Sequence, residues 1–420
     1  MMKNIKHKTD NQISSELSRR KFIKAAGASL ALLTFPGLAT SLSVKNSAVN
    51  SPKSPKIVWV LLRGALDSLH TVVPTFDTQY QVLRPHLSTS FNKPLLPLDN
   101  GFALHPSLVN LHQWYQQKQL TPVVAVSSGY SRRSHFDGQD YLESGAGSID
   151  YNTGWLARAI DVKNKRALAV SRSIPISLRS SEHVFTWYPT KLKSADDDIY
   201  QSLINLYQDD ESLKTNLISG LEVMGVIGKE AVMQKDKMKQ GKFVELSQSC
   251  AKLMIKEEGV DCAMLELGGW DTHNNQAKRL EKNLTELDDG LAALKTGLGG
   301  EWQNTIVIVG TEFGRTAKEN GTGGTDHGTA SALFLAGGAL SPEKETSKGN
   351  VANTSSSKEV LIGGKIAGKW PGLTDTELFE QRDLMPTTNS FSWIAKVLTQ
   401  HWGFTDAELL QVFPQLKQIS

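Results

Sequence analysis

Continuous apolar runs of strand length, separated by segments with helical periodicity, constrain the fold of this chain more than any other feature. The runs occupy Lys56–Leu62, Thr121–Ser127, Val260–Leu267 and Thr305–Val309, with a weaker fifth at Ser331–Leu335. Strands that are apolar on both faces are typical of a sheet covered on both sides. Amphipathic segments lie between or beyond them at Ser107–Lys118, Ala277–Leu298 and Ser390–Trp402. The alternation predicts an α/β fold with a parallel-rich central sheet between helices.

Composition narrows the class of protein. With 420 residues, 39% hydrophobic and 21% charged, the chain is neither disordered nor a polytopic membrane protein. The net charge is +3, but residues 1–39 hold seven of the 46 Lys and Arg residues and only two of the 43 acids. The remainder therefore has a net charge of −2, which gives no electrostatic reason to expect nucleic-acid binding. The two cysteines, Cys250 and Cys262, are too few for a disulfide framework, and their spacing leaves their pairing open.

Residues 1–39 predict an export signal. A basic segment with the pair Arg19 and Arg20 precedes a short apolar stretch at Ala25–Phe35 and the small residues Gly37 and Ala39. This order of basic, apolar and small residues is typical of a signal peptide, and the arginine pair resembles the twin-arginine signal of bacteria. We therefore expect recognition by the twin-arginine export machinery and a periplasmic or secreted location. Because that route carries folded proteins, it favours a metal or redox centre in the body.

The rest of the chain is interpreted as one main domain. Residues 40–55 are expected to form a linker, 56–403 the α/β domain and 404–420 a C-terminal tail. Few strand signals occur in 191–257, which predicts a helical insertion or cap there. The acidic run Asp196-Asp197-Asp198 near its start is typical of a solvated loop or a helix start.

Polar residues follow four of the expected strands or lie in glycine-rich loops. Because the carboxyl ends of parallel strands share one edge of a sheet, we expect these side chains to converge there. Acids and imidazoles that converge in this way suit metal-assisted hydrolysis, and arginines suit planar oxyanions. The candidates, in chain order, are Asp67; Arg133, Ser134 and His135; Asp271 and His273; and Glu312, Arg315, Asp326 and His327.

Individual candidates differ in how specific they are. Asp67 alone is equally typical of a helix N-cap. Asp271 and His273 flank one residue, so an extended backbone would place both on one face, where they could share a metal. A standard α/β-hydrolase, a P-loop protein and a dinucleotide-binding protein are disfavoured, because the corresponding glycine motifs are missing from the sequence.

Together these motifs resemble the secreted bacterial family catalogued as domain of unknown function 1501. The resemblance spans about residues 56–403 and includes Arg-Ser-His-Phe (133–136), Gly-Gly-Trp-Asp-Thr-His (268–273) and Gly-Gly-Thr-Asp-His-Gly (323–328). It also rests on residues 62–74, 105–108, 312–316, 370–373 and 382–388. That family is grouped with the alkaline phosphatase and sulfatase-like superfamily. The grouping implies a mixed, mostly parallel sheet between helices and a one- or two-metal site for phosphate or sulfate esters.

The same resemblance implies functional roles for individual residues. Asp67 resembles the superfamily's metal-binding acid after the first strand, and Ser134 lies near its nucleophile region, with His135 as a rival. Asp271 and His273 resemble the superfamily's second Asp/His pair of metal ligands. His327, together with Asp326, resembles the remaining ligands. One departure is Glu312-Phe313-Gly314, where the superfamily usually has Asp-His-Gly. One imidazole ligand is then missing, unless residues 326–328 replace it. Neither cysteine has the context of a formylglycine sulfatase, which disfavours that class.

Two functions from different classes follow. The first is an exported hydrolase of sulfate or phosphate esters that uses a divalent metal (Zn, Mn, Ca or Mg), with Arg133 or Arg315 stabilising oxyanion charge. Its substrate would be a small-molecule or polysaccharide ester. The alternative is a non-catalytic exported binding or assembly protein that keeps the fold with an incomplete metal site. A redox protein is disfavoured, since the chain has no haem or iron–sulfur motif.

Overall fold

The computed structural model describes residues 54–189, 197–211, 213–215, 217–218, 220–221, 242–255, 260–340 and 361–418. The expected export signal at 1–39 lies outside these residues, as do nearly all of the expected linker and Asp196 of the acidic run. Residues from Pro52 onward belong to one compact unit. In the part of the chain that is described, no helix has the length and apolar character needed to cross a membrane.

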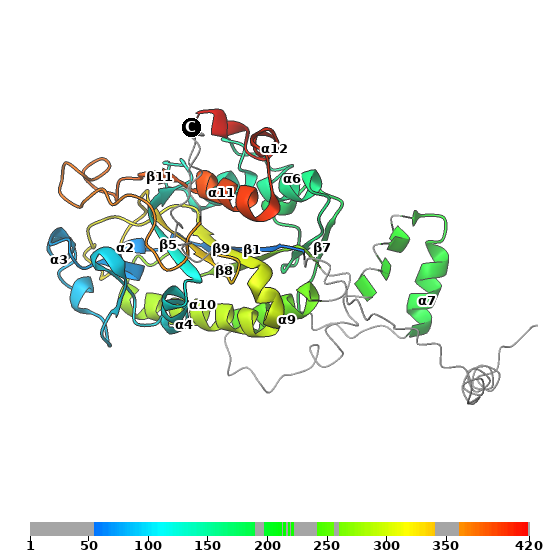
Figure 1. Cartoon of the computed structure of the whole chain (residues 1–420), viewed down its shortest axis with the longest axis horizontal. Coiled ribbons are helices and arrows are strands. Elements are labelled where there is room, and N and C mark those ends of the chain that lie inside the picture. Colours follow the sequence, from blue (N-terminus) through cyan, green and yellow to red (C-terminus); the bar gives the residue numbers. More distant parts are fainter. Residues whose placement is uncertain are drawn as a thin grey trace, which may run out of the picture. The chain divides into compact units, whose positions relative to one another are not determined.

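A mixed sheet of eight strands forms the centre of the described residues, in the order β11-β5-β10-β9-β1-β8-β6-β7 (Figure 1). β1 pairs in parallel with β8 and β9, β6 with β7 and β8, and β11 with β5, whereas β10 runs antiparallel between β5 and β9. The mixed, mostly parallel sheet between helices is therefore confirmed. The strands are β1 Lys56–Arg63, β5 Leu120–Ser127, β6 Ala167–Ala169, β7 Val184–Thr186, β8 Cys262–Gly268, β9 Thr305–Thr311, β10 Ser331–Ala336 and β11 Thr388–Asn389.

Helices cover both faces of the sheet (Figure 1). One layer contains α5 His135–Ser144, α6 Trp155–Val162, α11 Ser390–Trp402 and α12 Asp406–Val412. The other contains α4 Val109–Gln116, α9 Lys242–Met254 and α10 Gln276–Leu298. Alternate residues of β1 serve the two layers, because successive side chains of a strand point to opposite faces. Ile57, Trp59 and Leu61 pack with the first layer, and Val58, Val60 and Leu62 pack with the second.

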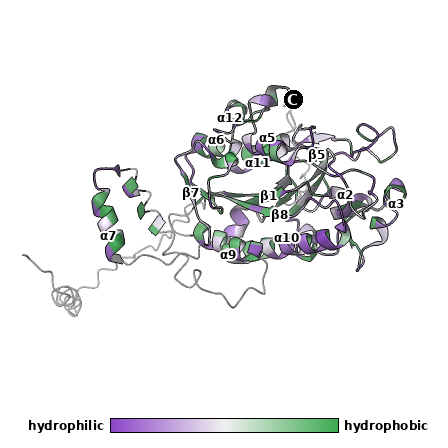
Figure 2. Cartoon of the chain, turned by 180° about the vertical axis from the view of Figure 1, so that it is seen from behind, coloured by the Kyte–Doolittle hydropathy of each residue, from purple (hydrophilic) through white to green (hydrophobic). Residues whose placement is uncertain are grey.

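Hydropathy along the elements matches these two cores. The central strands are hydrophobic, whereas α9 and α10 carry residues of both kinds (Figure 2). In α10 the buried positions include Leu280, Leu284, Leu287 and Leu291, which repeat at the three- and four-residue spacing of one helix face. The periodicity that predicts a helix over 277–298 is therefore the buried stripe of α10.

Smaller elements lie outside the main sheet. A three-stranded sheet has the order β2-β4-β3, with β2 Val72–Pro74, β3 Leu96–Pro97 and β4 Phe102–Leu104. The short helices are α2 Ser68–Thr71 and α3 Gln79–Leu83, and α7 spans Asp197–Leu206. The 3₁₀ helices are η1 Leu87–Thr89, η2 Asp99–Gly101, η3 Ile176–Leu178, η5 Gly299–Asn304 and η6 Pro414–Gln418.

The ends of the domain and its cysteines add detail to the sequence-based expectations. The region 191–257 contributes α7 and α9, and α9 buries Phe243, Cys250 and further apolar residues against the core rather than standing apart from it. Residues 404–420, expected to form a tail, contain α12 and η6. Val412 and Phe413 of this segment are fully buried, so its apolar residues complete the core beside α6. Cys250 and Cys262 are both buried and free.

Candidate metal centre

Four loops meet at the edge of the sheet where the parallel strands end. Arg63 of β1 pairs with Gly268 of β8, and Leu62 pairs with Thr311 of β9, so these three strands end side by side. β5 runs parallel to them, because β10 is antiparallel to both β5 and β9. The loops that leave β1, β5, β8 and β9 therefore start from one edge, as expected for the site of an open α/β sheet.

Glycine lets these loops approach one another closely. Gly64, just after β1, has φ +120°, and a Cβ at this position would lie 2.6 Å from the backbone nitrogen of Asp271. A Cβ on Gly324 would likewise overlap the carbonyl group of His273. Residues with side chains rarely adopt a φ like that of Gly64. The glycines around the predicted polar residues thus bring their backbones together.

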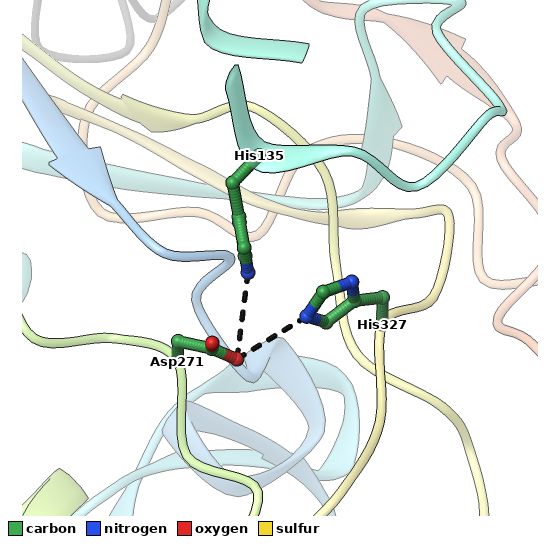
Figure 3. A group of neighbouring side chains, drawn as sticks. All are labelled: His135, Asp271 and His327. Atoms are coloured by element: carbon green, nitrogen blue, oxygen red, sulfur yellow. Dashed lines mark ion pairs between the residues drawn. The ribbon is translucent and has the colours of Figure 1, made fainter. Parts of the chain in front are cut away.

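Three of the predicted side chains form a compact group, which Figure 3 shows. His135 begins α5, Asp271 follows β8, and His327 lies in the loop between β9 and β10. The Oδ1 atom of Asp271 is 3.4 Å from Nε2 of His135 and 3.3 Å from Nε2 of His327. One ligand atom from each residue lies within 4.8 Å of the other two. The expected convergence of an acid and imidazoles from separate loops is therefore present.

A fourth predicted residue, His273, adjoins this group. Its Nε2 lies 3.0 Å from Asp271 Oδ1 and 3.0 Å from Nε2 of His327. Three imidazoles thus direct Nε2 toward one carboxylate oxygen. The side chain of Asp271 is 41% exposed, so the cluster is open to solvent on one side.

Each imidazole is held at its other nitrogen. Nδ1 of His135 lies 2.8 Å from Oε1 of Glu312, and Nδ1 of His273 lies 3.0 Å from Oδ1 of Asp326. Nδ1 of His327 lies 2.9 Å from the carbonyl oxygen of Arg133. Because these oxygens only accept, each Nδ1 carries the proton, which leaves the lone pair on Nε2 when the ring is neutral. Metal-binding histidines are commonly supported in this manner.

The donor set fits a divalent cation. Nε2 of His135 is buried and has no hydrogen-bond partner among the described residues. Nε2 of His273 faces Nε2 of His327 at 3.0 Å, and two lone pairs at that distance repel unless a proton or a cation lies between them. Imidazole nitrogens with one carboxylate oxygen are the ligands of zinc and other transition metals. His135, Asp271 and His327 therefore make a possible metal site, with His273 as a further donor.

Electrostatics keeps the carboxylates of the site ionised. Burial raises the pKa of Asp271, but the hydrogen bond and charge of Arg315 outweigh burial and lower it. Burial likewise raises the pKa of Glu312, but hydrogen bonds from His135 and Gln139 bring it below its usual value. For His327 burial is the main cause, and it lowers the pKa of the ring. For His135 burial lowers the pKa, but the hydrogen bond and charge of Glu312 outweigh burial and raise it. Of these two rings, His327 is therefore the one shifted toward the neutral state that binds a metal.

Two predicted arginines support the cluster. Arg315 is buried, and its Nη1 lies 2.6 Å from Asp271 Oδ1, while its Nε donates to Thr325. Arg133 directs its guanidinium to Asp383, with Nη2 2.8 Å from Oδ2. Both arginines are thus engaged with carboxylates, and Arg133 contacts the cluster through its carbonyl group.

Three other predicted residues have partners that the sequence does not reveal. Asp67 caps α2 by accepting from the backbone of Leu69, and its Oδ2 accepts from Arg84 at 2.7 Å and also from Gln276. It does not belong to the group of His135, Asp271 and His327. Glu312 stands behind His135 as its hydrogen-bond acceptor. Ser134 is the N-cap of α5, and its hydroxyl accepts from the backbone nitrogen of Asp137.

Some residues that contact the site were not among the candidates chosen from the sequence. Gln139 on α5 donates to Glu312 at 3.0 Å, and Thr325 accepts from Arg315.

Comparisons with known proteins give one family and several similar folds. A family model described as "Protein of unknown function (DUF1501)" matches residues 116–348, more than half of the chain. No curated protein matches significantly. Among solved structures, the chain is similar to an alkaline phosphatase from the Antarctic bacterium TAB5, at 12% identity over 68% of this chain and 92% of that chain, with a TM-score of 0.34.

Two further structures are similar at the same level. One is the zinc complex of the C-terminal periplasmic domain of EcEptC from Escherichia coli, at 7% identity, 68% and 73% coverage of the two chains and a TM-score of 0.35. The other is the murine ectonucleotide pyrophosphatase/phosphodiesterase 5, at 11% identity, 62% and 57% coverage and a TM-score of 0.32. Identities this low say nothing about activity.

Proposed function

Since the chain belongs to the DUF1501 family of proteins of unknown function, its activity has to be inferred from its site, and we propose an exported, metal-dependent hydrolase of phosphate or sulfate esters. One observation carries the proposal. The Nε2 atoms of His135, His273 and His327 converge on Oδ1 of Asp271, while every Nδ1 is hydrogen-bonded to an acceptor.

The cluster would hold the metal through His135, Asp271 and His327, with His273 as the fourth donor. Of the cations expected from the sequence, zinc and manganese suit imidazole ligands better than calcium and magnesium do. A divalent cation held there would act as a Lewis acid toward an ester oxygen and would ease ionisation of the attacking group. The solvent-exposed side of Asp271 leaves room for a substrate.

The protein's own residues orient these donors. Glu312 and Asp326 keep the proton of His135 and His273 on Nδ1, so that both rings present Nε2 to the cluster. Arg315 fixes the carboxylate of Asp271 and draws on Thr325 for its own orientation. Donors that are oriented in advance reduce the reorganisation needed for catalysis.

Ester hydrolysis, rather than another metal-dependent reaction, is favoured by the motifs shared with the alkaline phosphatase and sulfatase-like superfamily. The nucleophile proposed from that resemblance is Ser134, which precedes His135 in the chain and caps α5. Its hydroxyl is partly exposed and accepts a hydrogen bond of 3.4 Å, so the oxygen is held only weakly. His135 is the less suitable nucleophile, because its Nδ1 is engaged by Glu312 and its Nε2 faces the cluster.

One contact favours the second candidate, a non-catalytic binding or assembly protein. Nη1 of Arg315 lies 2.6 Å from Asp271 Oδ1, the oxygen on which the imidazoles converge, and a guanidinium neutralises a carboxylate without any metal. A carboxylate has enough lone pairs to accept from an arginine and bind a cation together. The metal content therefore decides between the two candidates.

The deciding experiment measures metal content and ester turnover on one preparation. The protein is purified without chelators, its metals are determined by elemental mass spectrometry, and phosphate and sulfate esters are screened. We expect roughly one transition-metal ion per chain, and loss of both metal and turnover in His327→Ala. His86→Ala is the control, because His86 is an exposed histidine outside the cluster. A folded wild-type protein without metal or turnover would establish the non-catalytic candidate.

A further inference from the structure

Residues 382–388 carry one of the motifs on which the family resemblance rests, and they lead into β11. Within them Asp383 is fully buried. A buried carboxylate requires charged or hydrogen-bonding partners to offset the loss of water. The partners of Asp383 therefore indicate what this segment does.

A short backbone segment after β9 connects Asp383 to the loop of His327. Arg315 pairs with His327, and the next residue, Thr316, pairs with Asp383, both in antiparallel bridges. The loop that carries a candidate metal ligand and the segment that carries Asp383 therefore both pair with residues 315–316.

The side chain of Asp383 joins two loops of the site. Its Oδ2 accepts from Nε of Arg133 at 3.0 Å, from Nη2 of Arg133 at 2.8 Å and from the hydroxyl of Thr329 at 2.7 Å. Its Oδ1 accepts from Nη1 of Arg382 at 3.1 Å. Arg133 belongs to the loop between β5 and α5, and Thr329 belongs to the loop between β9 and β10. One carboxylate oxygen thus holds both loops.

Both of these loops contact or contain His327. Thr329 follows His327 by two residues in the same loop. The carbonyl oxygen of Arg133 lies 2.9 Å from Nδ1 of His327, while the guanidinium of Arg133 is engaged by Asp383 and, at 2.5 Å, by Glu380. The guanidinium therefore anchors Arg133, and its carbonyl group is the part that meets the imidazole.

The backbone is strained at both ends of this link. Arg133 has φ +60°, and Glu380 and Gln381, in the turn just before Asp383, have φ +55° and +54°. Residues with a side chain rarely adopt this left-handed region. Such conformations persist only where the surrounding structure holds them, and they collect at functional sites. The hydrogen bonds between Arg133 and Asp383 are contacts that hold Arg133 in this way.

The acceptor for His327 is weaker than the acceptors for the other two imidazoles. Nδ1 of His135 and Nδ1 of His273 each face a carboxylate, whereas Nδ1 of His327 faces an uncharged carbonyl group. A hydrogen bond to an ionised acceptor is roughly twice as strong as one between neutral groups. The orientation of His327 therefore depends on how firmly the backbone of Arg133 is placed.

We propose that Asp383 is a positioning residue for His327. Its carboxylate holds the side chain of Arg133, which keeps the carbonyl oxygen of Arg133 against Nδ1 of His327, and it holds the loop of His327 through Thr329. The ring proton then stays on Nδ1, and the lone pair of Nε2 faces Asp271 (Figure 3). The inference rests on the metal cluster of the proposed function and deepens it, because it assigns the group that supports this imidazole.

Nitrogen NMR of the metal-free protein tests the link without metal or substrate. The histidines are isotope-labelled, the ring nitrogens of His327 are assigned by their loss in His327→Ala, and spectra are recorded at about pH 8, where an unperturbed imidazole is neutral. The wild-type ring should be protonated at Nδ1. Asp383→Asn and Arg133→Lys should each shift the ring toward protonation at Nε2, because the carbonyl acceptor is no longer held in place.

Zinc affinity gives a second readout. Competition with a chromogenic chelator should show about tenfold weaker binding in each single variant, the lower end of the loss typical of groups that support a metal ligand. The double variant Asp383→Asn/Arg133→Lys should lose about as much as either single variant. The effects of two residues that act through one contact do not add.

Asp288→Asn is the matched control. Asp288 is a similarly buried acid, and it accepts from the backbone and side chain of Asn110, outside the metal cluster. This variant should leave the ring of His327 and the zinc affinity unchanged, so that loss of a buried carboxylate as such is separated from loss of the link to His327.

Three results would overturn the inference: an unchanged His327 ring in Asp383→Asn, an equal change in the control, or additive losses of zinc affinity. If Asp383→Asn does not fold, an unchanged ring in Arg133→Lys overturns it in the same way. A shifted His327 ring in a protein that binds no zinc and hydrolyses no ester would keep the role of Asp383 and reject the proposed function.

Discussion

At the scale of single residues, Glu312 shows how a departure from the pattern of the superfamily that the sequence resembles is compensated by another loop. Its side chain is fully buried, and Oε1 accepts from His135, Gln139 and the backbone nitrogen of Gly64. The sequence makes Glu312 a candidate metal ligand, at a position where the superfamily that the chain resembles usually has Asp-His. The structure instead puts its charge one step behind an imidazole that comes from another loop. His135 thereby supplies a nitrogen donor that the Glu312-Phe313-Gly314 segment lacks.

Replacing that carboxylate should weaken metal binding without unfolding the chain. Glu312→Gln keeps the shape of the side chain but removes the charge that orients His135 and raises its basicity. Loss of such a supporting group typically costs about 10- to 100-fold in metal affinity, which competition with a chromogenic chelator measures. Glu319→Gln is the matched control, since Glu319 accepts from Nδ1 of His86 outside the cluster. Unchanged affinity in Glu312→Gln would contradict the role of Glu312.

At the scale of elements, the sequence predicts what is long and buried. β1, β5, β8, β9 and β10 each have at least six residues, most or all of them buried, and each expected run is confirmed as a strand. β6, β7 and β11 have three residues or fewer. So short a segment carries no periodicity, and only pairing with a neighbouring strand defines it.

The candidate site likewise has a part that the sequence predicts and a part that it does not. Convergence of the loops was predictable, because parallel strands end at one edge. Which side chains point into the cluster depends on partners far along the chain. Asp67 pairs with Arg84, 17 residues away, and with Gln276, 209 residues away. An aspartate that caps a helix cannot be distinguished in the sequence from one that binds a metal. Only its contacts with residues far along the chain distinguish the two roles.

The close approach of the loop after β1 to the loop after β8 can be tested at Gly64. Gly64→Ala would strain a backbone with φ +120° and place a methyl group 2.6 Å from the nitrogen of Asp271. We expect a loss of about 1–3 kcal/mol in the free energy of unfolding, together with weaker metal binding because Asp271 must shift. Gly321→Ala is the control, since a Cβ there meets nothing within 4 Å. Wild-type stability and metal affinity in Gly64→Ala would show that the close approach is not needed.

At the scale of the whole molecule, the export signal expected from residues 1–39 would determine where the folded chain acts. Arg19→Lys/Arg20→Lys keeps the charge of the basic segment but removes the arginine pair. We expect the variant to remain in the cytoplasm, because the twin-arginine route reads the pair itself, and cell fractionation with an antibody measures this. Lys3→Arg/Lys6→Arg, elsewhere in the basic segment, is the control for a change of residue type. Periplasmic accumulation of the signal variant would reject this export route.

The buried pair of Asp67 and Arg84 holds distant parts of the molecule together. Nη1 of Arg84 lies 2.7 Å from Asp67, and its other nitrogens donate to the carbonyl oxygens of Thr316 and Ala317. Both side chains are almost completely buried. Removing one partner leaves the other charge unpaired in the interior, which typically costs about 3–5 kcal/mol. Asp67→Asn should therefore lower the free energy of unfolding by roughly that amount while leaving the metal content unchanged.

The loss of stability in Asp67→Asn should depend on pH in a characteristic way. Burial raises the pKa of Asp67, but the charge and hydrogen bond of Arg84 outweigh burial, so the folded-state pKa lies below its usual value. A carboxyl group with a lowered pKa stabilises the fold above the unfolded-state pKa of about 4, and that stabilisation is lost as the pH falls through the folded-state value. Chemical denaturation should thus show a constant gap between wild type and Asp67→Asn above about pH 5.

Below about pH 4 the same gap should narrow, because the wild-type carboxyl group becomes protonated whereas the amide of the variant does not titrate. Asp261→Asn removes an acid from the more exposed pair with Lys165 and should cost at most about 1 kcal/mol. A gap in Asp67→Asn as small as that of the control would mean that the buried pair does not stabilise the fold. Loss of the metal from Asp67→Asn would instead make Asp67 the ligand that its position after the first strand predicts.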